Sequence, residues 1–222
     1  MDVALPGGET VPSHDFFRRA RARLTLDVPA ALSDLTATAA RGDLDLEPSL
    51  WERAGVTATR PAAVLIPVVD RPEPMVLLTL RTELPSHPGQ IAFPGGKIDP
   101  GDASPAAAAL REAQEEIGLT RELIEPIGYL DLYLTFSGFR ILPTVARVNP
   151  DYRLALNERE VADAFEVPLA FLMDANNHAL HSRDWKGIER KYYAMPFGER
   201  YIWGVTAGIV RNLYERIYQK AA

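Results

Sequence analysis

Three glutamates, Glu112, Glu115 and Glu116, follow one another at spacings of three and four residues. In a helix these spacings place side chains on the same side, where like charges repel by about 0.2–0.5 kcal/mol per pair. A solvated helix surface tolerates this repulsion, which is the ordinary explanation of such a charge run. A bound cation would remove it, and carboxylate oxygens without a nearby histidine or cysteine suit Mg²⁺ or Mn²⁺ better than zinc.

The glutamates belong to a segment whose other residues predict a helix. Ser104 suits the N-cap, and Pro105 suits the first helical position, where a missing N–H costs nothing. Gly118 suits the end of the helix, because glycine readily adopts the left-handed conformation found there. Apolar residues recur on a separate face at three- and four-residue steps, which predicts that this face packs on a core: Ala106, Leu110, Ala113 and Ile117.

A glycine loop precedes this helix, and the two together resemble the signature box of the Nudix hydrolases. Gly96 and Asp102 take the first two positions of the family pattern, and residues 111–119 reproduce its second half. Asp102 replaces a glutamate, and the stretch from Asp102 to Arg111 is one residue longer than in the family pattern. Ala113 is small for the apolar position. The number of matching positions nevertheless argues against a chance match.

The resemblance implies metal-dependent hydrolysis of a diphosphate. Glu112, Glu115 and Glu116 would be the metal ligands, with the backbone carbonyl of Gly96 as an uncharged ligand. Arg111 would orient a carboxylate, because its planar guanidinium can bind both carboxylate oxygens.

The general base stays open at this stage. Glu112 or Glu116 could activate water, and so could an acid from another loop. The strongest external candidates are Glu158 and Glu160, which lie in a turn-like stretch. We expect the glutamates of the helix to hold the metal and one of these two acids to assist.

Four further stretches resemble the coenzyme A pyrophosphatase branch of the Nudix family. Residues 77–82 and 87–96 precede the helix, while residues 157–169 and 201–209 follow it, so that the resemblance covers roughly residues 60–215. It implies that coenzyme A or a derivative is cleaved to 4′-phosphopantetheine and adenosine 3′,5′-bisphosphate. The substrate-binding residues implied are Arg81, His87, Gly89, Phe93, Gly95 and Lys97.

The chain departs from this branch between Arg81 and Gly89, where it is one residue shorter. Pro85 and Ser86 stand where an arginine is expected, and Thr82 replaces the usual serine or alanine. The departures keep two alternatives open. One is a hydrolase of another nucleoside diphosphate derivative, such as ADP-ribose or a dinucleotide, and the other is a ligand-sensing domain without turnover.

The composition excludes several other classes of protein. The 222 residues are 47% hydrophobic and 24% charged, as in soluble globular proteins. A net charge of −6 argues against a protein that wraps nucleic acid, and the absence of cysteine excludes disulfides and zinc–thiolate sites. No apolar run is long enough to span a bilayer, and the N-terminus has no apolar signal core. We therefore expect a cytoplasmic protein without membrane or nucleic-acid partners.

The resemblance implies a Nudix domain over residues 59–222, and a partly helical extension is expected over residues 1–58. Strands interleaved with helices predict a three-layer α/β/α sandwich around a mixed sheet. The extension could form a dimer interface or a lid. Strands are expected at 63–69, 75–80, 127–134, 141–148 and within 185–195, and helices within 13–26 and at 105–117, 168–173 and 206–218.

Overall fold

The computed structural model describes residues 2–4, 10–12, 15–35, 41–43, 45–46, 59–82, 89–185 and 188–219. The main element is a nine-stranded mixed sheet in the order β11-β5-β4-β10-β9-β3, with β6 paired to β5, β7 to β4 and β8 to β10. Its strands are β3 (Arg41–Gly42), β4 (Arg60–Val69), β5 (Met75–Arg81), β6 (Ile91–Ala92), β7 (Gly95–Lys97), β8 (Ile124–Tyr129), β9 (Tyr133–Leu134), β10 (Phe139–Val148) and β11 (Val161–Pro168).

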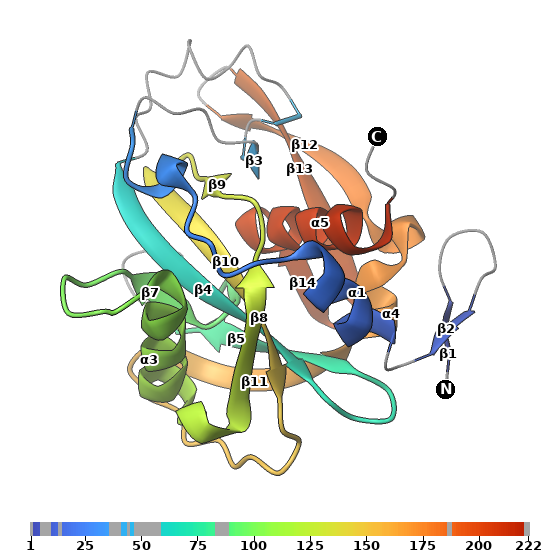
Figure 1. Ribbon diagram of the computed structural model, residues 1–222. Helices are drawn as coiled ribbons and strands as arrows, with labels where there is room; N and C mark the ends of the chain where they lie inside the picture. The colour runs from blue at the N-terminus through green and yellow to red at the C-terminus, as the bar shows by residue number, and fades with distance from the viewer. Residues whose placement is uncertain are drawn as a thin grey trace.

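Helices cover both faces of this sheet, which confirms the predicted three-layer α/β/α sandwich (Figure 1). Helix α3 lies on one face, and α1, α4 and α5 lie on the other. The helices are α1 (Asp15–Arg23), α3 (Pro105–Ile117), α4 (Leu169–Met173) and α5 (Val205–Tyr218), with short 3₁₀ turns η1 (Ala30–Leu32), η2 (Arg121–Leu123) and η3 (Ala175–Asn177).

Strand β4 shows why both faces are covered. Its side chains alternate between the two faces, as in any strand, and they are apolar on both. Ala63 and Leu65 pack with α3, whereas Ile66 and Val68 pack with the helices of the opposite face. All four side chains are fully buried, with an exposed fraction of 0%. A strand buried on both faces reads as a continuous apolar run, which is why the sequence identifies it.

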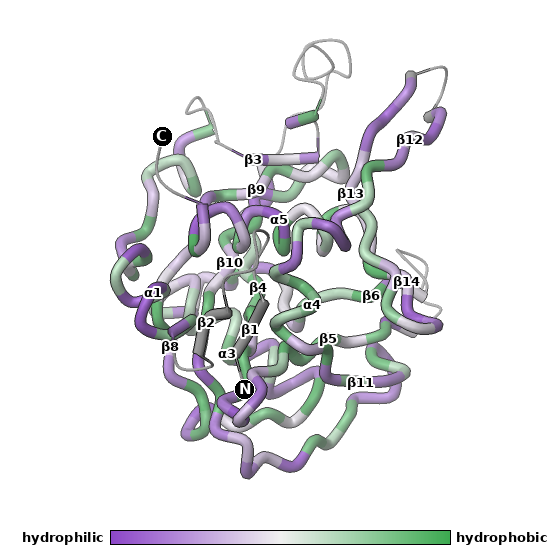
Figure 2. The backbone as a smooth tube through the Cα atoms, turned by 90° about the vertical axis from the view of Figure 1, so that its right-hand side faces the viewer, coloured by the Kyte–Doolittle hydropathy of each residue, from purple (hydrophilic) through white to green (hydrophobic). Residues whose placement is uncertain are grey.

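A second sheet of three antiparallel strands adjoins the first: β12 (Ala179–Trp185), β13 (Ile188–Phe197) and β14 (Arg200–Trp203). The outer part of β12 projects beyond the body of the molecule and is hydrophilic (Figure 2). Strands β13 and β14 pack against α5. A short pair of strands, β1 (Asp2–Ala4) and β2 (Thr10–Pro12), lies near the N-terminus.

Most of the predicted elements are confirmed within a few residues, and two predicted strands are corrected. The strand expected at 127–134 is split into β8 and β9, because the backbone leaves the ladder at residues 130–132. Trp185 ends β12, so the alternating strand begins at Ile188 instead. Strands β11 and β12 were not predicted, because neither has a clean apolar alternation.

Part of the predicted N-terminal extension belongs to the main fold. Phe16 and Phe17 of α1 are buried in the core below α5, and β3 pairs in parallel with β9. The division at residue 58 stays a prediction. No helix among the described residues is long and apolar enough to cross a membrane.

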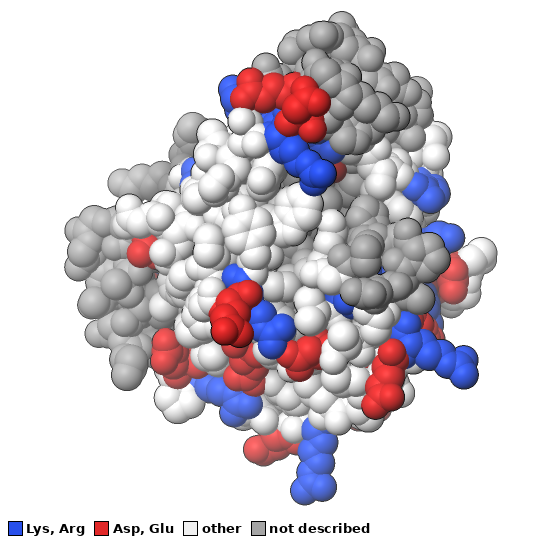
Figure 3. Space-filling model, turned by 180° about the vertical axis from the view of Figure 1, so that it is seen from behind, with Lys and Arg blue, Asp and Glu red and all other residues white. Residues whose placement is uncertain are grey.

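On the face seen in Figure 3, basic and acidic side chains are interspersed, and uncharged surface separates an upper group from a lower belt. Such a mixed surface produces no strong field of one sign over this face. Recognition of a charged ligand must then depend on individual side chains that line a cavity.

Candidate active site

The helix that carries the three glutamates is α3, and it begins and ends as the sequence predicts. The Ala107 N–H donates to Ser104 Oγ over 3.1 Å, and Pro105 occupies the first turn. Gly118 adopts a left-handed φ of 69° and its N–H reaches the carbonyls of the last turn. The predicted apolar stripe is buried, so the orientation of the helix on the sheet determines where its glutamates point.

The glycine loop approaches α3 so closely that larger residues would not fit. A Cβ atom added to Gly96 would lie 2.5 Å from the Glu112 carboxylate carbon of α3, and one added to Gly95 would clash with the Ala63 carbonyl oxygen of the neighbouring strand β4. The Gly95 N–H also donates to Glu116 Oε2 over 3.2 Å. Two adjacent glycines therefore let the carboxylates of the helix meet the backbone of β7.

Glu116 is 4% exposed, and its burial raises the pKa of its carboxyl to about 7. The Gly95 N–H and Arg81, whose Nη1 lies 3.9 Å from Glu116 Oε1, oppose that rise, whereas Glu112 and Glu160 add to it. Burial likewise raises the pKa of Glu112. Carboxylates with raised pKa values in a cavity are typical of functional sites, because their charge is poorly compensated until a ligand binds.

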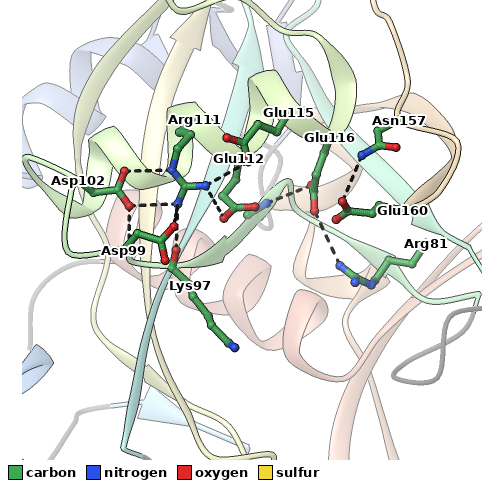
Figure 4. A network of polar contacts seen from close by, with 11 residues as sticks. Arg81, Lys97, Asp99, Asp102, Arg111, Glu112, Glu115, Glu116, Asn157 and Glu160 are labelled. Carbon is green, nitrogen blue, oxygen red and sulfur yellow. Dashed lines mark hydrogen bonds and ion pairs between the residues drawn. The ribbon is translucent and has the colours of Figure 1, made fainter.

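Arg111 connects Asp102 of the preceding loop with Glu112 and Glu115 of α3 (Figure 4). Its Nε and Nη2 donate to the two carboxylate oxygens of Asp102 over 3.1 and 3.0 Å. Its Nη1 donates to Glu112 Oε1 over 2.9 Å and to Glu115 Oε2 over 3.1 Å. Hydrogen bonding by Arg111 lowers the pKa of Asp102 against a smaller effect of burial. Asp102, which stands where the family pattern has a glutamate, thus forms a bidentate pair with Arg111.

The two external acids have different surroundings. Glu160 is half-buried, accepts a hydrogen bond at Oε1 from Asn157 Nδ2 over 3.1 Å, and lines the same cavity as Glu112 and Glu116. Glu158 is exposed and does not line that cavity. The turn that carries both leads into β11 rather than into a helix.

A single cavity of about 1250 Å³ contains the two glutamates of α3 and Glu160 on one wall. Of the substrate-binding residues implied by the sequence, Arg81, Phe93, Gly95 and Lys97 line this cavity. Gly89 does not line it, and His87 lies outside the described residues. Glu115 is exposed and does not line this cavity, and it pairs with the same Arg111 Nη1 that contacts Glu112.

The far wall of the cavity is not predicted from the sequence. That wall comes from β3, the loop after β9 and the second sheet, which meet only in the folded chain. No local spacing signals it. Its residues include Arg41, Asp43, Tyr133, Phe136, Arg183, Arg190, Tyr192 and Trp203.

The glutamates suit a divalent cation by their chemistry. Glu112 and Glu116 present hard carboxylate oxygens beside the closely approaching backbone of Gly96, and Mg²⁺ and Mn²⁺ prefer such ligands. A cation would also offset the mutual repulsion and burial that raise the pKa of Glu116. Among the described residues, no three acidic or histidine side chains already converge into a complete metal-binding group, because Arg111, Arg81 and the Gly95 N–H engage the carboxylates.

Known proteins are similar to this chain. A family model for the NUDIX domain matches residues 59–190. Two proteins described as "Uncharacterized Nudix hydrolase NudL" are similar in sequence. The protein of Cronobacter sakazakii is 43% identical over 170 residues, and the match covers 72% of this chain and 84% of the relative. The protein of Escherichia coli K12 is 41% identical over 155 residues, and the match covers 69% of this chain and 81% of the relative. The Caenorhabditis elegans Ap4A hydrolase, solved as a binary complex, is 24% identical with a TM-score of 0.41 over 49% of this chain and 80% of its own.

Proposed function

This chain belongs to the Nudix hydrolase family, a family of pyrophosphatase enzymes that generally use divalent metal ions, and from that premise we propose that it cleaves the diphosphate of coenzyme A or its derivatives. The proposed cofactor is Mg²⁺ or Mn²⁺. Water attacks one phosphorus of the diphosphate, and the bond between that phosphorus and the bridging oxygen breaks. The products are 4′-phosphopantetheine and adenosine 3′,5′-bisphosphate.

The observation that carries this proposal is the position of Arg81. It ends β5, within the stretch that resembles the coenzyme A branch, and its Nη1 lies 3.9 Å from Glu116 Oε1. Phe93, from the second such stretch, lines the same cavity. The two stretches upstream of α3 thus contribute to one wall with the glutamates, as a substrate-binding role requires. If these two stretches served only to pack the core, there would be no reason for both of them to line the cavity beside the glutamates.

Glu112 and Glu116, with the Gly96 backbone, would hold the metal, which when bound neutralises the diphosphate and lowers the pKa of a coordinated water. Arg111 keeps Glu112 in place through the Asp102 pair. Arg81 can bind a non-bridging phosphate oxygen with its guanidinium. We assign the general base to Glu160, because Asn157 orients its carboxylate toward the cavity, and the carboxylate would take the proton from the attacking water.

The two alternatives make different use of the same site. Another nucleoside diphosphate derivative would keep the chemistry of the glutamates and change only the contacts beyond the diphosphate. A ligand-sensing domain has no need of several carboxylates with raised pKa values around a cavity. The retained Glu112 and Glu116 therefore favour an enzyme.

A substrate panel with Mg²⁺ and with Mn²⁺ tests the proposal. It would include coenzyme A, acetyl-coenzyme A, ADP-ribose, NADH and diadenosine polyphosphates, with the products separated by chromatography. We expect preferential release of adenosine 3′,5′-bisphosphate and its loss on chelation. Activity confined to other nucleotides would overturn the coenzyme A assignment, and binding without turnover of any compound would favour a sensor.

A further inference from the structure

The cavity continues well beyond the glutamates. Its volume of about 1250 Å³ exceeds the roughly 300–1,000 Å³ of typical small-molecule pockets, and a diphosphate fills only a small part of it. A large part of the far wall belongs to the second sheet, β12, β13 and β14. Whatever part of the substrate lies beyond the diphosphate must meet this wall.

Two arginines oppose each other directly on this wall. Arg183 of β12 pairs in register with Arg190 of β13, and both line the cavity. Like charges at such a cross-strand pair are destabilising, because opposed residues point to the same face of the sheet. The pair therefore opposes folding locally unless an anion lies between the two side chains or beside them.

The two arginines differ in their compensation. Arg190 has Asp43 at 3.5 Å and stacks on the ring of Phe136 at 4.5 Å, while its buried Nε has no hydrogen-bond partner among the described residues. Arg183 is exposed to the cavity and pairs with no carboxylate in the described part of the chain. Asp43 can balance one positive charge, so the second one is available to a ligand.

Aromatic rings lie next to this pair. Tyr192 follows Arg190 by two residues, which places both side chains on the same face of β13. Its ring meets that of Trp203 at 5.5 Å and an interplanar angle of 64°, and both residues line the cavity. Aromatic side chains beside arginines are the usual surroundings of a stacked nucleotide base and its phosphate.

We propose that Arg183, Arg190, Tyr192 and Trp203 form a subsite for a phosphorylated nucleoside, in which the arginine pair binds a phosphomonoester on the ribose and the rings contact the base. The inference rests on the proposed function, because it takes the diphosphate to lie at Glu112 and Glu116. It goes further by assigning recognition of the ribose phosphate to the second sheet. Nucleotides with this extra phosphate would be preferred over the same nucleotides without it.

Binding of the product-like probes adenosine 3′,5′-bisphosphate and AMP, measured by calorimetry, tests the subsite without requiring turnover. We expect the wild-type protein to bind the bisphosphate about tenfold more tightly or better, since a hydrogen-bonded charge pair contributes of that order. Arg183→Ala should abolish most of this preference, and Arg183→Lys should restore part of it because the charge returns. Arg121→Ala, at an exposed arginine of η2 on another part of the molecule, is the matched control and should keep the preference.

Hydrolysis of coenzyme A and of 3′-dephospho-coenzyme A provides the second measurement. The ratio of their kcat/KM values should favour coenzyme A and fall about tenfold in Arg183→Ala. Equal affinity of the wild type for the two probes, or an unchanged preference in Arg183→Ala, would overturn the subsite. A bisphosphate preference that depends on Arg183, in a protein that cleaves neither coenzyme A compound, would support the subsite and overturn the proposed function.

Discussion

At the scale of single residues, the site is organised by which carboxylates face the cavity and which face solvent. Glu116 is almost fully buried, and burial raises its pKa to about 7 even though Arg81 and the Gly95 N–H favour the charged form, so that a bound cation would favour its ionisation further. Glu115, one residue earlier, is exposed and bound to Arg111. These two glutamates of the same helix therefore have different surroundings, and of the two only Glu116 faces the cavity where the reaction would take place.

The first prediction separates the two external acids. Glu160→Gln should lower kcat by roughly 10²-fold or more, because general bases contribute about 10²–10⁴-fold and the amide cannot accept the proton. Glu158→Gln should lower it far less, since Glu158 is exposed and lies outside the cavity. Single-turnover rates at saturating Mg²⁺ measure the difference. Equal losses in both variants would remove the general-base assignment from Glu160.

The second prediction concerns the close approach of the glycine loop. Gly96→Ala should reduce activity at least about tenfold, because the new methyl group would lie 2.5 Å from the Glu112 carboxylate carbon and must displace it. Gly101→Ala is the matched control, since nothing lies within 4 Å of its added Cβ. We expect Gly101→Ala to keep its activity and its melting temperature within a few degrees. A fully active Gly96→Ala would show that the position of Glu112 is not critical.

The sequence predicts residues well where their partners are close along the chain. Glu112 and Glu116 are brought together by helical periodicity alone, and Asp102 by its place in the motif. The choice between Glu158 and Glu160 depends instead on the direction of a turn, and the opposition of Arg183 and Arg190 depends on strand register. Neither the turn direction nor the register can be read from composition or spacing.

At the scale of elements, Arg111 connects α3 to the loop before it, so that the two are held together as one unit. Its guanidinium reaches Asp102 in the loop, Glu112 on the helix and the carbonyl of Lys97 on β7 over 3.2 Å. Three elements of the site are therefore connected through one side chain. The planar fork of arginine makes this connection possible, and an ammonium group cannot copy it.

The third prediction follows from that geometry. Arg111→Lys should lower kcat/KM about tenfold or more, because lysine cannot bind both oxygens of Asp102 and also Glu112. The free energy of unfolding, measured with urea, should fall by about 1–3 kcal/mol, as expected when a hydrogen-bonded charge pair is lost. Arg121→Lys, at an exposed position, is the control. An Arg111→Lys variant with wild-type activity would show that bidentate binding of Asp102 is dispensable.

The elements that the sequence does not predict lie at edges and in the second sheet. Strand β11 is an edge strand whose middle residues are only partly buried, so it lacks the alternation of a half-buried strand. Strand β12 is mostly polar and is held by its ladder to β13. Such strands exist because a neighbour offers hydrogen bonds, and a local pattern contains no information about that neighbour.

At the scale of the whole molecule, the second sheet and the helical layer are joined near His178. This histidine is 8% exposed, with Nε2 2.8 Å from the Leu172 carbonyl and Nδ1 3.5 Å from Arg211 Nη1 of α5. Its ring also meets that of Tyr214 edge-on at 5.5 Å. The surroundings suit a neutral imidazole that donates from Nε2 and accepts at Nδ1. Burial lowers the pKa of His178 below 6.5, and Arg211 adds to the decrease, while the Leu172 carbonyl opposes it.

The last prediction is a dependence of stability on pH. As pH falls through 6.5, the unfolded chain binds a proton at His178 before the folded chain does, so stability must fall until the lower folded pKa is passed. The contribution of one such group is at most about 1.4 kcal/mol per pH unit. Protonation of Glu116, whose pKa is raised to about 7, acts in the opposite direction over the same range, so the His178 contribution is a difference between two proteins. In urea unfolding between pH 7.5 and 5, His178→Gln should gain stability relative to the wild type as pH falls, even if the variant is less stable throughout.

His181→Gln serves as the control for that experiment, because His181 is exposed on β12 and is stacked only on Tyr192. Its slope should match that of the wild type. A slope that His178→Gln leaves unchanged would assign the acid sensitivity to the carboxylates instead. That outcome would show that the junction between the second sheet and α5 tolerates a charged imidazole, and that its packing does not depend on the neutral form.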